Sequence, residues 1–376
     1  MKTLELPKTR ILDTNIRPEM QLILCCARTQ VDDANAERIK TLIKTADINW
    51  QDVINNAYKH GLMPLLYTNL NAIAKESVPE DAFNQLRSLF YTNAQRSLML
   101  TGELVKILRL LQEHGISAVP YKGPVLTTLL YGNVALRQFC DLDILVQRQD
   151  VLEFKKLLIA QGYTAQVQLT EAEEIAYLQD KSKHTYNFIH DSKRIMIEVH
   201  WRITPQYTSS IEPKHIWKNL KESSFGGTTI STLSLEDWLP ILCAHASRHC
   251  WEKLSWLSDI AEIIRRNPEL DWERIIKETS DLDCRRMLFI GVSLTRNLIG
   301  ANINSEILNK IEADSEVHTL ASEICQQIFS EKDNSRKFMQ TTLYHIRVRE
   351  RWQNKVLYFE LFLRWLMRDQ QVLIDD

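Results

Sequence analysis

The sequence predicts an α+β fold in which a block of short strands lies between two helical regions. Apolar residues recur at helical spacing before Gly115 and again after about Ser234. Between these stretches the pattern changes to short apolar runs and strict alternation, which are typical of strands. We therefore expect an N-terminal helical region over residues 1–115, a core of strands and helices over 116–204, and a C-terminal helical region over 205–376.

The composition is that of an ordinary globular protein. Of the 376 residues, 44% are hydrophobic and 25% are charged, and the formal net charge is −2. This net charge argues against a uniformly positive surface of the kind that binds duplex nucleic acid, but it does not exclude a local basic groove. No apolar run approaches the ~20 residues of a membrane span, and the seven cysteines show neither metal-site nor disulfide spacing. We expect a soluble, cytoplasmic protein without a transmembrane segment.

The residues before Gly115 predict several packed helices. One of them, which Asp47 or Asn49 could cap, has an apolar stripe made of Trp50, Val53, Ile54 and Ala57. The last helix repeats the pattern with Leu100, Leu104, Ile107, Leu108 and Leu111. Gly115 then stands at the position where glycine commonly ends a helix.

The predicted core begins with a strand that leads into a helix. The strand covers residues 116–121, and Pro124 suits the first turn of the helix because its missing donor would be unpaired there. A second strand holds Asp141 and Asp143. The elements expected after it are a helix over 152–160 capped by Asp150, a strand over 163–169, a helix over 171–179, and a hairpin of strands over 185–190 and 194–203.

Beyond Pro205 the chain reads as loop through Gly227 and then as helices, with Ser234 and Asp271 at helix starts. The apolar run over residues 356–367 is too short and too charged to span a bilayer. It follows a basic stretch with Arg347, Arg349, Arg351 and Lys355. We expect a helix that docks on the body or on a partner, with contact to a membrane surface as the alternative.

Three carboxylates are expected on one face of the core sheet. Asp141 and Asp143 lie two residues apart in a strand, so both project to the same face. Glu198 alternates with aliphatic residues in a later strand and shares its face with His200. Such a cluster suits Mg²⁺ or Mn²⁺ and commonly serves phosphoryl transfer. Alternatively, an isolated Asp-x-Asp is common on surfaces, and Glu198 could lie on a solvated sheet face.

Three further residues are candidates for binding phosphate. Lys122 and Gly123 stand directly before a helix, where glycine lets the backbone approach closely and free amides attract phosphate. Arg137 lies in the connection that leads to the Asp-x-Asp strand. Lys122 and Arg137 could equally be ordinary surface charges.

Histidines at positions 245 and 249 share one face of a predicted helix. They could hold a metal, but Ala246 replaces the glutamate of the zinc-protease motif. The apolar stripe around them favours core histidines that hydrogen-bond to neighbours such as Asp259. If this helix covered the open face of the sheet, His245 or Arg248 would instead meet substrate.

Several motifs, in this order, resemble those of the uncharacterised nucleotidyltransferase family within the DNA polymerase β-like superfamily. The resemblance covers roughly residues 20 to 265. The motifs are His-Gly-Leu-Met-Pro-Leu-Leu at 60–66, Tyr-Lys-Gly-Pro at 121–124, Leu-Tyr-Gly at 130–132, Leu-Arg-Gln-Phe-Cys-Asp-Leu-Asp-Ile-Leu-Val at 136–146, Gln-Gly-Tyr at 161–163 and Ile-Glu-Val-His-Trp-Arg at 197–202.

The resemblance implies a nucleotidyltransferase fold, in which a small mixed sheet with flanking helices carries the metal site. By this resemblance Asp141 and Asp143 match the metal-binding pair, and Glu198 matches the third acid. Gly123 stands where the superfamily usually has Gly-Ser. The serine hydroxyl is absent here, and Lys122 could compensate as a phosphate-binding charge.

We therefore expect a metal-dependent nucleotidyltransferase that uses Mg²⁺ or Mn²⁺ and moves an NMP from an NTP to an acceptor. A small molecule, a protein and an RNA are all compatible as the acceptor. Asp141 and Asp143 would bind both metals, and Glu198 would hold the catalytic metal and help to activate the acceptor hydroxyl. The phosphates would be contacted by Lys122, Gly123 and Arg137.

Two other functions fit the same sequence. The altered Gly-Ser position is compatible with a degenerate nucleotidyltransferase fold that serves as a nucleotide-binding or interaction module. An Asp-x-Asp glycosyltransferase would also bind a metal and a sugar nucleotide, but it should place a longer nucleotide-binding α/β unit before the motif, where this chain is mostly helical.

Overall fold

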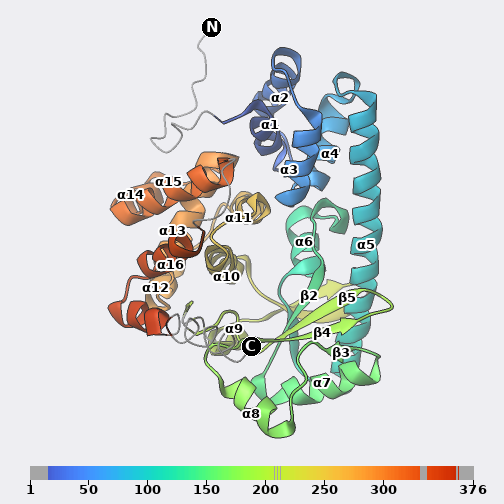
Figure 1. Ribbon diagram of the computed structural model, residues 1–376, viewed down its shortest axis with the longest axis vertical. Helices are drawn as coiled ribbons and strands as arrows, with labels where there is room; N and C mark the ends of the chain where they lie inside the picture. Colours follow the sequence, from blue (N-terminus) through green and yellow to red (C-terminus); the bar gives the residue numbers. More distant parts are fainter. Residues whose placement is uncertain are drawn as a thin grey trace, which may run out of the picture.

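The predicted α+β fold is confirmed by the computed structural model, which describes residues 16–206, 208–209, 211, 213–330, 337–360 and 363. A five-stranded sheet in the order β1-β2-β5-β4-β3 lies among helices that precede and follow it in the chain. Figure 1 shows the long helix α5 along one side of the molecule, reaching from the N-terminal helices to the sheet, with the C-terminal helices on the opposite side.

The N-terminal helices form as the apolar stripes predict. Asn49 caps α3 by accepting a hydrogen bond from the amide of Asp52 at 3.2 Å. The stripe predicted for the last helix is buried on α5. The elements are α1 (Pro18–Cys26), α2 (Asp33–Thr45), α3 (Trp50–Lys59), α4 (Met63–Ile73), η1 (Lys75–Ser77) and α5 (Glu80–Glu113).

The core sheet is mixed because β2 pairs with β5 in parallel, whereas the other neighbouring strands pair antiparallel. Its elements are β1 (Ala118–Pro120), α6 (Gly123–Tyr131), η2 (Val134–Leu136), β2 (Asp141–Val146), η3 (Arg148–Asp150), α7 (Val151–Ala160), β3 (Thr164–Ala165), α8 (Glu171–Gln179), β4 (Thr185–His190) and β5 (Ile195–His200).

Two predicted details of the core are wrong. The strand expected over 163–169 is reduced to Thr164–Ala165 at the sheet edge, where it has only β4 as a neighbour. Asp150 precedes α7 but makes no side-chain cap, because it belongs to a 3₁₀ turn that runs directly into the helix.

The loop expected through Gly227 is also wrong in part, because it contains a short helix over Pro213–Lys218 and the first strand and turn of a β-hairpin. Gly226 and Gly227 both have positive φ (57° and 73°), as a tight two-residue hairpin turn requires. Ser234 and Asp271 cap helices as predicted, because their side chains accept hydrogen bonds from the backbone amides of Asp237 and Arg274 respectively. The elements are α9 (Pro213–Lys218), β6 (Lys221–Phe225), β7 (Thr228–Thr232), α10 (Leu235–Arg248), α11 (Leu254–Arg266), α12 (Trp272–Asp281), α13 (Arg285–Leu294), η4 (Thr295–Ile299), α14 (Ser305–Glu312), α15 (Ser315–Phe329) and α16 (Lys337–Arg347).

Buried apolar side chains from all three regions form one contiguous core, from Met20 to Val348. The division at residues 115 and 204 stays a prediction. The expected docking helix over 356–367 is described only at residues 356–360 and 363, which are helical, and its other residues fall outside the described part of the chain. Before it, Arg347 pairs with Glu316 and Glu323. None of the described helices has the length and hydrophobicity needed to span a bilayer.

Candidate active site

The register of β2 and β5 brings the predicted carboxylates to one face of the sheet. Asp143 lies directly opposite Glu198 in this parallel pair, and Asp141 lies two residues earlier in β2. The intervening residues, Leu142 and Ile197, point to the other face and are fully buried. The aliphatic residues therefore fix the register, and the register places the acids side by side.

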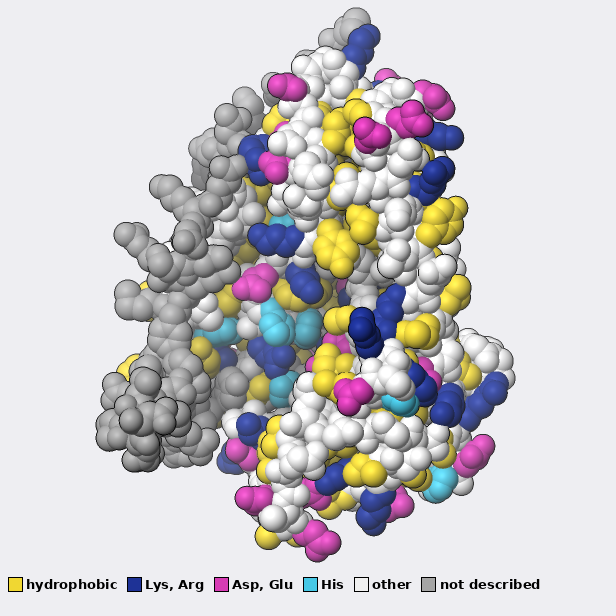
Figure 2. All heavy atoms as spheres, turned by 45° about the vertical axis from the view of Figure 1, so that its right-hand side comes forward, with side chains coloured by type: hydrophobic (Ala, Val, Ile, Leu, Met, Phe, Trp, Pro, Cys, Tyr) yellow, Lys and Arg dark blue, Asp and Glu magenta, His cyan; other side chains and the backbone are white. Residues whose placement is uncertain are grey.

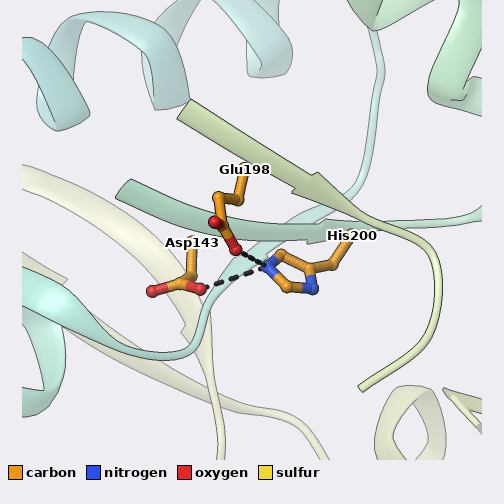
Figure 3. Close-up of side chains that lie close together, drawn as sticks. All are labelled: Asp143, Glu198 and His200. Carbon is orange, nitrogen blue, oxygen red and sulfur yellow. Dashed lines mark hydrogen bonds and ion pairs between the residues drawn. The ribbon is translucent and has the colours of Figure 1, made fainter. Parts of the chain in front are cut away.

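His200 joins this cluster, although the sequence analysis did not name it as a site residue. Its Nε2 atom lies 3.1 Å from Oδ1 of Asp143 and 3.2 Å from Oε2 of Glu198 (Figure 3). Its Nδ1 atom lies 3.0 Å from the hydroxyl of Tyr121. The signal for His200 was present in the alternation of β5, because a residue two positions after Glu198 must share its face.

The cluster has the donor set of a divalent metal site. Among the described residues, one ligand atom each from Asp143, Glu198 and His200 lie within 4.8 Å of one another. Asp141 falls outside that group but faces the same side of the sheet. Carboxylate oxygens with one imidazole suit Mn²⁺ well, and the carboxylates suit Mg²⁺.

Lys122 pairs with the same carboxylate that the metal would use. Its Nζ lies 2.7 Å from Oδ1 of Asp143, and the two side chains are 12% and 4% exposed. Lys122 comes directly before α6, and Gly123 begins that helix with a φ of 58°. A side chain at Gly123 would be strained by this φ, and its Cβ would lie 3.4 Å from the carbonyl oxygen of Asp141. The turn is therefore held close to the start of the Asp-x-Asp strand.

Burial and the neighbouring charges shift the pKa values of the clustered carboxyl groups in opposite directions. Burial, together with the carboxylate of Asp143, raises the pKa of Asp141 to about 6. Burial acts the same way on Asp143, but Lys122 and His200 outweigh it and hold its pKa well below the ordinary value. His200 likewise keeps the pKa of Glu198 below its ordinary value against the effect of burial. Three acids thus share one ammonium group, which leaves negative charge for a cation to balance.

Arg137 does not lie free to meet a phosphate. Its Nε and Nη2 donate to both carboxylate oxygens of Asp259 on α11 at 2.9–3.1 Å, and the Asp259 side chain is fully buried. The hydroxyl of Tyr131 donates to Asp259 as well, at 2.7 Å. Phosphate binding by Arg137 stays a prediction, but its guanidinium already has a carboxylate partner. In the described part of the chain, no hydrogen bond joins His245 or His249 to Asp259, whose oxygens accept from Arg137 and Tyr131 instead.

Helix α10 lies across from the acidic face. At its N-terminal end, Nε1 of Trp238 donates to the carbonyl oxygen of Tyr121 at 2.6 Å, immediately before the Lys122–Gly123 turn. At its C-terminal end, Nη1 of Arg248 lies 2.7 Å from Nε2 of His184, the residue before β4. Figure 2 shows histidine, lysine and arginine side chains gathered in a hollow at mid-height of the molecule.

Comparison with known proteins identifies the family of the chain. No curated protein and no solved structure matches the chain significantly. A family model described as uncharacterised nucleotidyltransferase matches residues 46–300, which is more than half of the 376 residues and includes the whole sheet together with α10 and α11. The chain belongs to this uncharacterised nucleotidyltransferase family.

Proposed function

We propose that this protein is a metal-dependent nucleotidyltransferase that moves a nucleoside monophosphate from an NTP to an acceptor. The observation that carries the proposal is the β2–β5 register, which sets Asp143 opposite Glu198 with Asp141 on the same face. Membership of the nucleotidyltransferase family supports it. The acceptor remains open between a small molecule, a protein and an RNA, and the cytoplasmic location stays a prediction.

The carboxylates would hold the metal in this proposal. Asp141, Asp143 and Glu198 would be its ligands, and His200 is placed to add a nitrogen ligand to the same site. A bound Mg²⁺ or Mn²⁺ offsets the charge that develops on phosphate oxygens during transfer. The excess of carboxylates over nearby ammonium groups is the feature of this chain that fits such an ion.

The other residues would position the reactants. Glu198 is the most exposed of the clustered acids that pair with His200, with 23% of its side chain accessible against 4% for Asp143. Its lowered pKa keeps it ionised at neutral pH, so it can accept a hydrogen bond from an incoming acceptor hydroxyl. Lys122 and the first amides of α6 are placed to attract the phosphates of the nucleotide.

The proposal is tested by incubating the full chain with labelled NTPs and panels of acceptors, with Mg²⁺, Mn²⁺ or a chelator. We expect transfer that requires the metal and that falls at least about 100-fold in Glu198→Gln, since metal-site partners typically contribute 10- to 100-fold even when they are not direct ligands. Glu171→Gln, on an exposed position of α8, is the matched control and should retain activity. Transfer that persists in the chelator, or in Glu198→Gln, would contradict the proposal.

A nucleotide-binding or interaction module is the second candidate function, and two observations favour it. The Lys122–Gly123 turn lacks the serine of the superfamily, and Lys122 already occupies one oxygen of Asp143. Calorimetric titration of metal and nucleotide beside the transfer assay separates the two functions, because a module binds without turnover. The glycosyltransferase alternative has lost its support, because the chain belongs to a nucleotidyltransferase family.

A further inference from the structure

A second group of side chains faces the acidic cluster from α10, and the proposed function so far leaves it without a role. Arg248 ends this helix, and its guanidinium is held from two sides. Nη1 lies 2.7 Å from Nε2 of His184, and Nη2 lies 3.0 Å from Nε2 of His249. Since guanidinium groups only donate, both imidazole nitrogens act as acceptors.

These imidazoles position Arg248 without neutralising it. His184 and His249 each accept through Nε2, so that nitrogen carries no proton and each ring is uncharged in this contact. In the described part of the chain, no carboxylate forms an ion pair with Arg248, so its positive charge is left for a ligand.

The group is continuous with the acidic cluster. The ring of His184 meets that of His200 edge to face, with 5.7 Å between their centres, and His200 contacts Asp143 and Glu198. Lys122 lies close enough to perturb both His184 and His249. Lys122 contacts Asp143 directly, and Arg248 reaches the cluster through His184, so both cations lie next to the carboxylates.

The position of α10 relative to the Lys122–Gly123 turn is fixed by hydrogen bonds near both ends of the helix. Trp238 near its start is hydrogen-bonded to Tyr121, and Arg248 at its end is hydrogen-bonded to His184. The 14 residues between Leu235 and Arg248 span about 20 Å. The helix therefore runs from the Lys122 turn to the start of β4. Because both ends are hydrogen-bonded, the distance between Arg248 and that turn is fixed by the fold.

We propose that Arg248, held by His184 and His249, binds the polyphosphate of the nucleotide and replaces the serine hydroxyl that the Lys122–Gly123 turn lacks. The proposal rests on the proposed nucleotidyltransferase function. A planar guanidinium with its donors in a fixed fork suits phosphate oxygens. Arg137, the arginine expected from the sequence, instead has its charge balanced by Asp259, which accepts from its Nε and Nη2.

The test is calorimetric binding of an NTP and of inorganic tripolyphosphate to the full chain. Arg248→Met should weaken both ligands roughly 10- to 100-fold, because hydrogen bonds to charged groups contribute about 1.5–3 kcal/mol. The matched control is Arg266→Met, which lies exposed at the far end of α11 and should leave both affinities unchanged. Binding of Mn²⁺ alone, followed by its paramagnetic resonance, should change less than about twofold in Arg248→Met.

Two further variants separate a local effect from misfolding. Arg248→Lys keeps the charge but cannot reach both imidazoles, so it should recover only part of the affinity. His184→Gln keeps a hydrogen-bond acceptor for the guanidinium. Because this hydrogen bond is retained, the affinity for both ligands should stay within about fivefold of the wild type. Circular dichroism and unfolding curves that match the wild type establish that each variant is folded.

The outcomes distinguish the two proposals. Arg248-dependent tripolyphosphate binding without any transfer would support this inference and overturn the proposed activity. Transfer and NTP binding that are unaffected by Arg248→Met would overturn this inference and leave the activity standing. Competition by nucleoside but not by tripolyphosphate would also overturn it, because recognition would then not involve the phosphates.

Discussion

Two buried ion pairs lie near the two ends of α6, and they differ in how completely their charges are balanced. The Arg137–Asp259 pair has one cation for one anion, and Tyr131 fills the remaining position on the carboxylate. The Lys122–Asp143 pair shares its surroundings with Glu198 and Asp141, so acids outnumber the single ammonium. The side chains of both pairs are at most 12% exposed.

The difference teaches that burial of an ion pair does not by itself mark a functional site. A balanced pair with every oxygen hydrogen-bonded is complete and holds α11 to the core. An unbalanced cluster is strained electrostatically and has unfilled capacity for a cation. Loss of a residue should therefore reduce stability at the first pair and reduce ligand binding at the second.

The largest expected effect is that of Asp143→Asn on transfer. Removal of this carboxylate takes away the acid that lies opposite Glu198, so turnover should fall at least about 100-fold. Because Asp141 and Glu198 remain as acidic neighbours of Lys122, the free energy of unfolding should fall by less than in Asp259→Asn, although the lowered pKa of Asp143 means that some stability is lost. Transfer rates and urea unfolding on the same preparation check both halves, and a strongly destabilised variant would contradict the comparison.

Asp259→Asn should show the opposite pattern. It leaves the guanidinium of Arg137 buried without a carboxylate, which typically costs about 3–5 kcal/mol of stability. Urea unfolding measures this loss. The double variant Arg137→Met/Asp259→Leu, which removes both charges, should recover a large part of it. If the double variant is as unstable as the single one, the ion pair is not the cause.

The raised pKa of Asp141 makes metal binding depend on pH. Its value of about 6 lies above the ordinary 3.8, so this group favours the folded state at low pH and loses that contribution as pH rises through 6. A metal needs the ionised form, and its affinity should therefore be about tenfold weaker at pH 5 than at pH 7. Mn²⁺ titrations at the two pH values measure this. Asp141→Asn should remove most of the difference, and an unchanged difference would assign it to another group.

Lys122→Met should separate the two roles given to this lysine. Without the ammonium on Asp143, a metal has no competitor, so Mn²⁺ should bind roughly tenfold more tightly, which corresponds to about 1.4 kcal/mol. NTP affinity should fall in the same variant, because a phosphate-binding charge is lost. Arg137→Met is the contrasting variant and should destabilise the fold without tightening the metal. Equal metal affinity in Lys122→Met and wild type would show that the ion pair does not compete.

The smallest effect is expected at the balanced pair. Tyr131→Phe removes one hydrogen bond to Asp259 but leaves the charges paired, so the free energy of unfolding should fall by only about 1 kcal/mol. Transfer should be unchanged. A thermal unfolding curve beside the transfer assay tests this, and lost activity with intact stability would place Tyr131 in the site.

Much of the fold and the acidic part of the site follow from local patterns. The period-two alternation around Asp143 and Glu198 fixes which face each acid takes, and the apolar residues between them fix the register. The caps at Asn49, Ser234 and Asp271 are equally local. Such features are predictable because their causes lie within a few residues of their effects.

The rest depends on pairs that are distant in the sequence. Arg137 and Asp259 are 122 residues apart, and nothing near Arg137 indicates that α11 supplies its partner. His184 and Arg248 are 64 residues apart, so the orientation of α10 was open. The hairpin at Gly226 was missed for another reason: its strands are polar, and only the paired glycines indicated a turn.

The hydrogen bond between Trp238 and Tyr121 bears on how small the working unit can be. A fragment that ended at residue 204 would lose the indole that binds the carbonyl oxygen of Tyr121, and it would lose Asp259 from beside Arg137. The fragment would keep all the strands of the core sheet. However, the guanidinium of Arg137 would lose its carboxylate partner, and the Lys122 turn would lose the hydrogen bond from Trp238. We therefore expect the sheet and helices α10 and α11 to form one structural unit, which must be expressed together to fold and function.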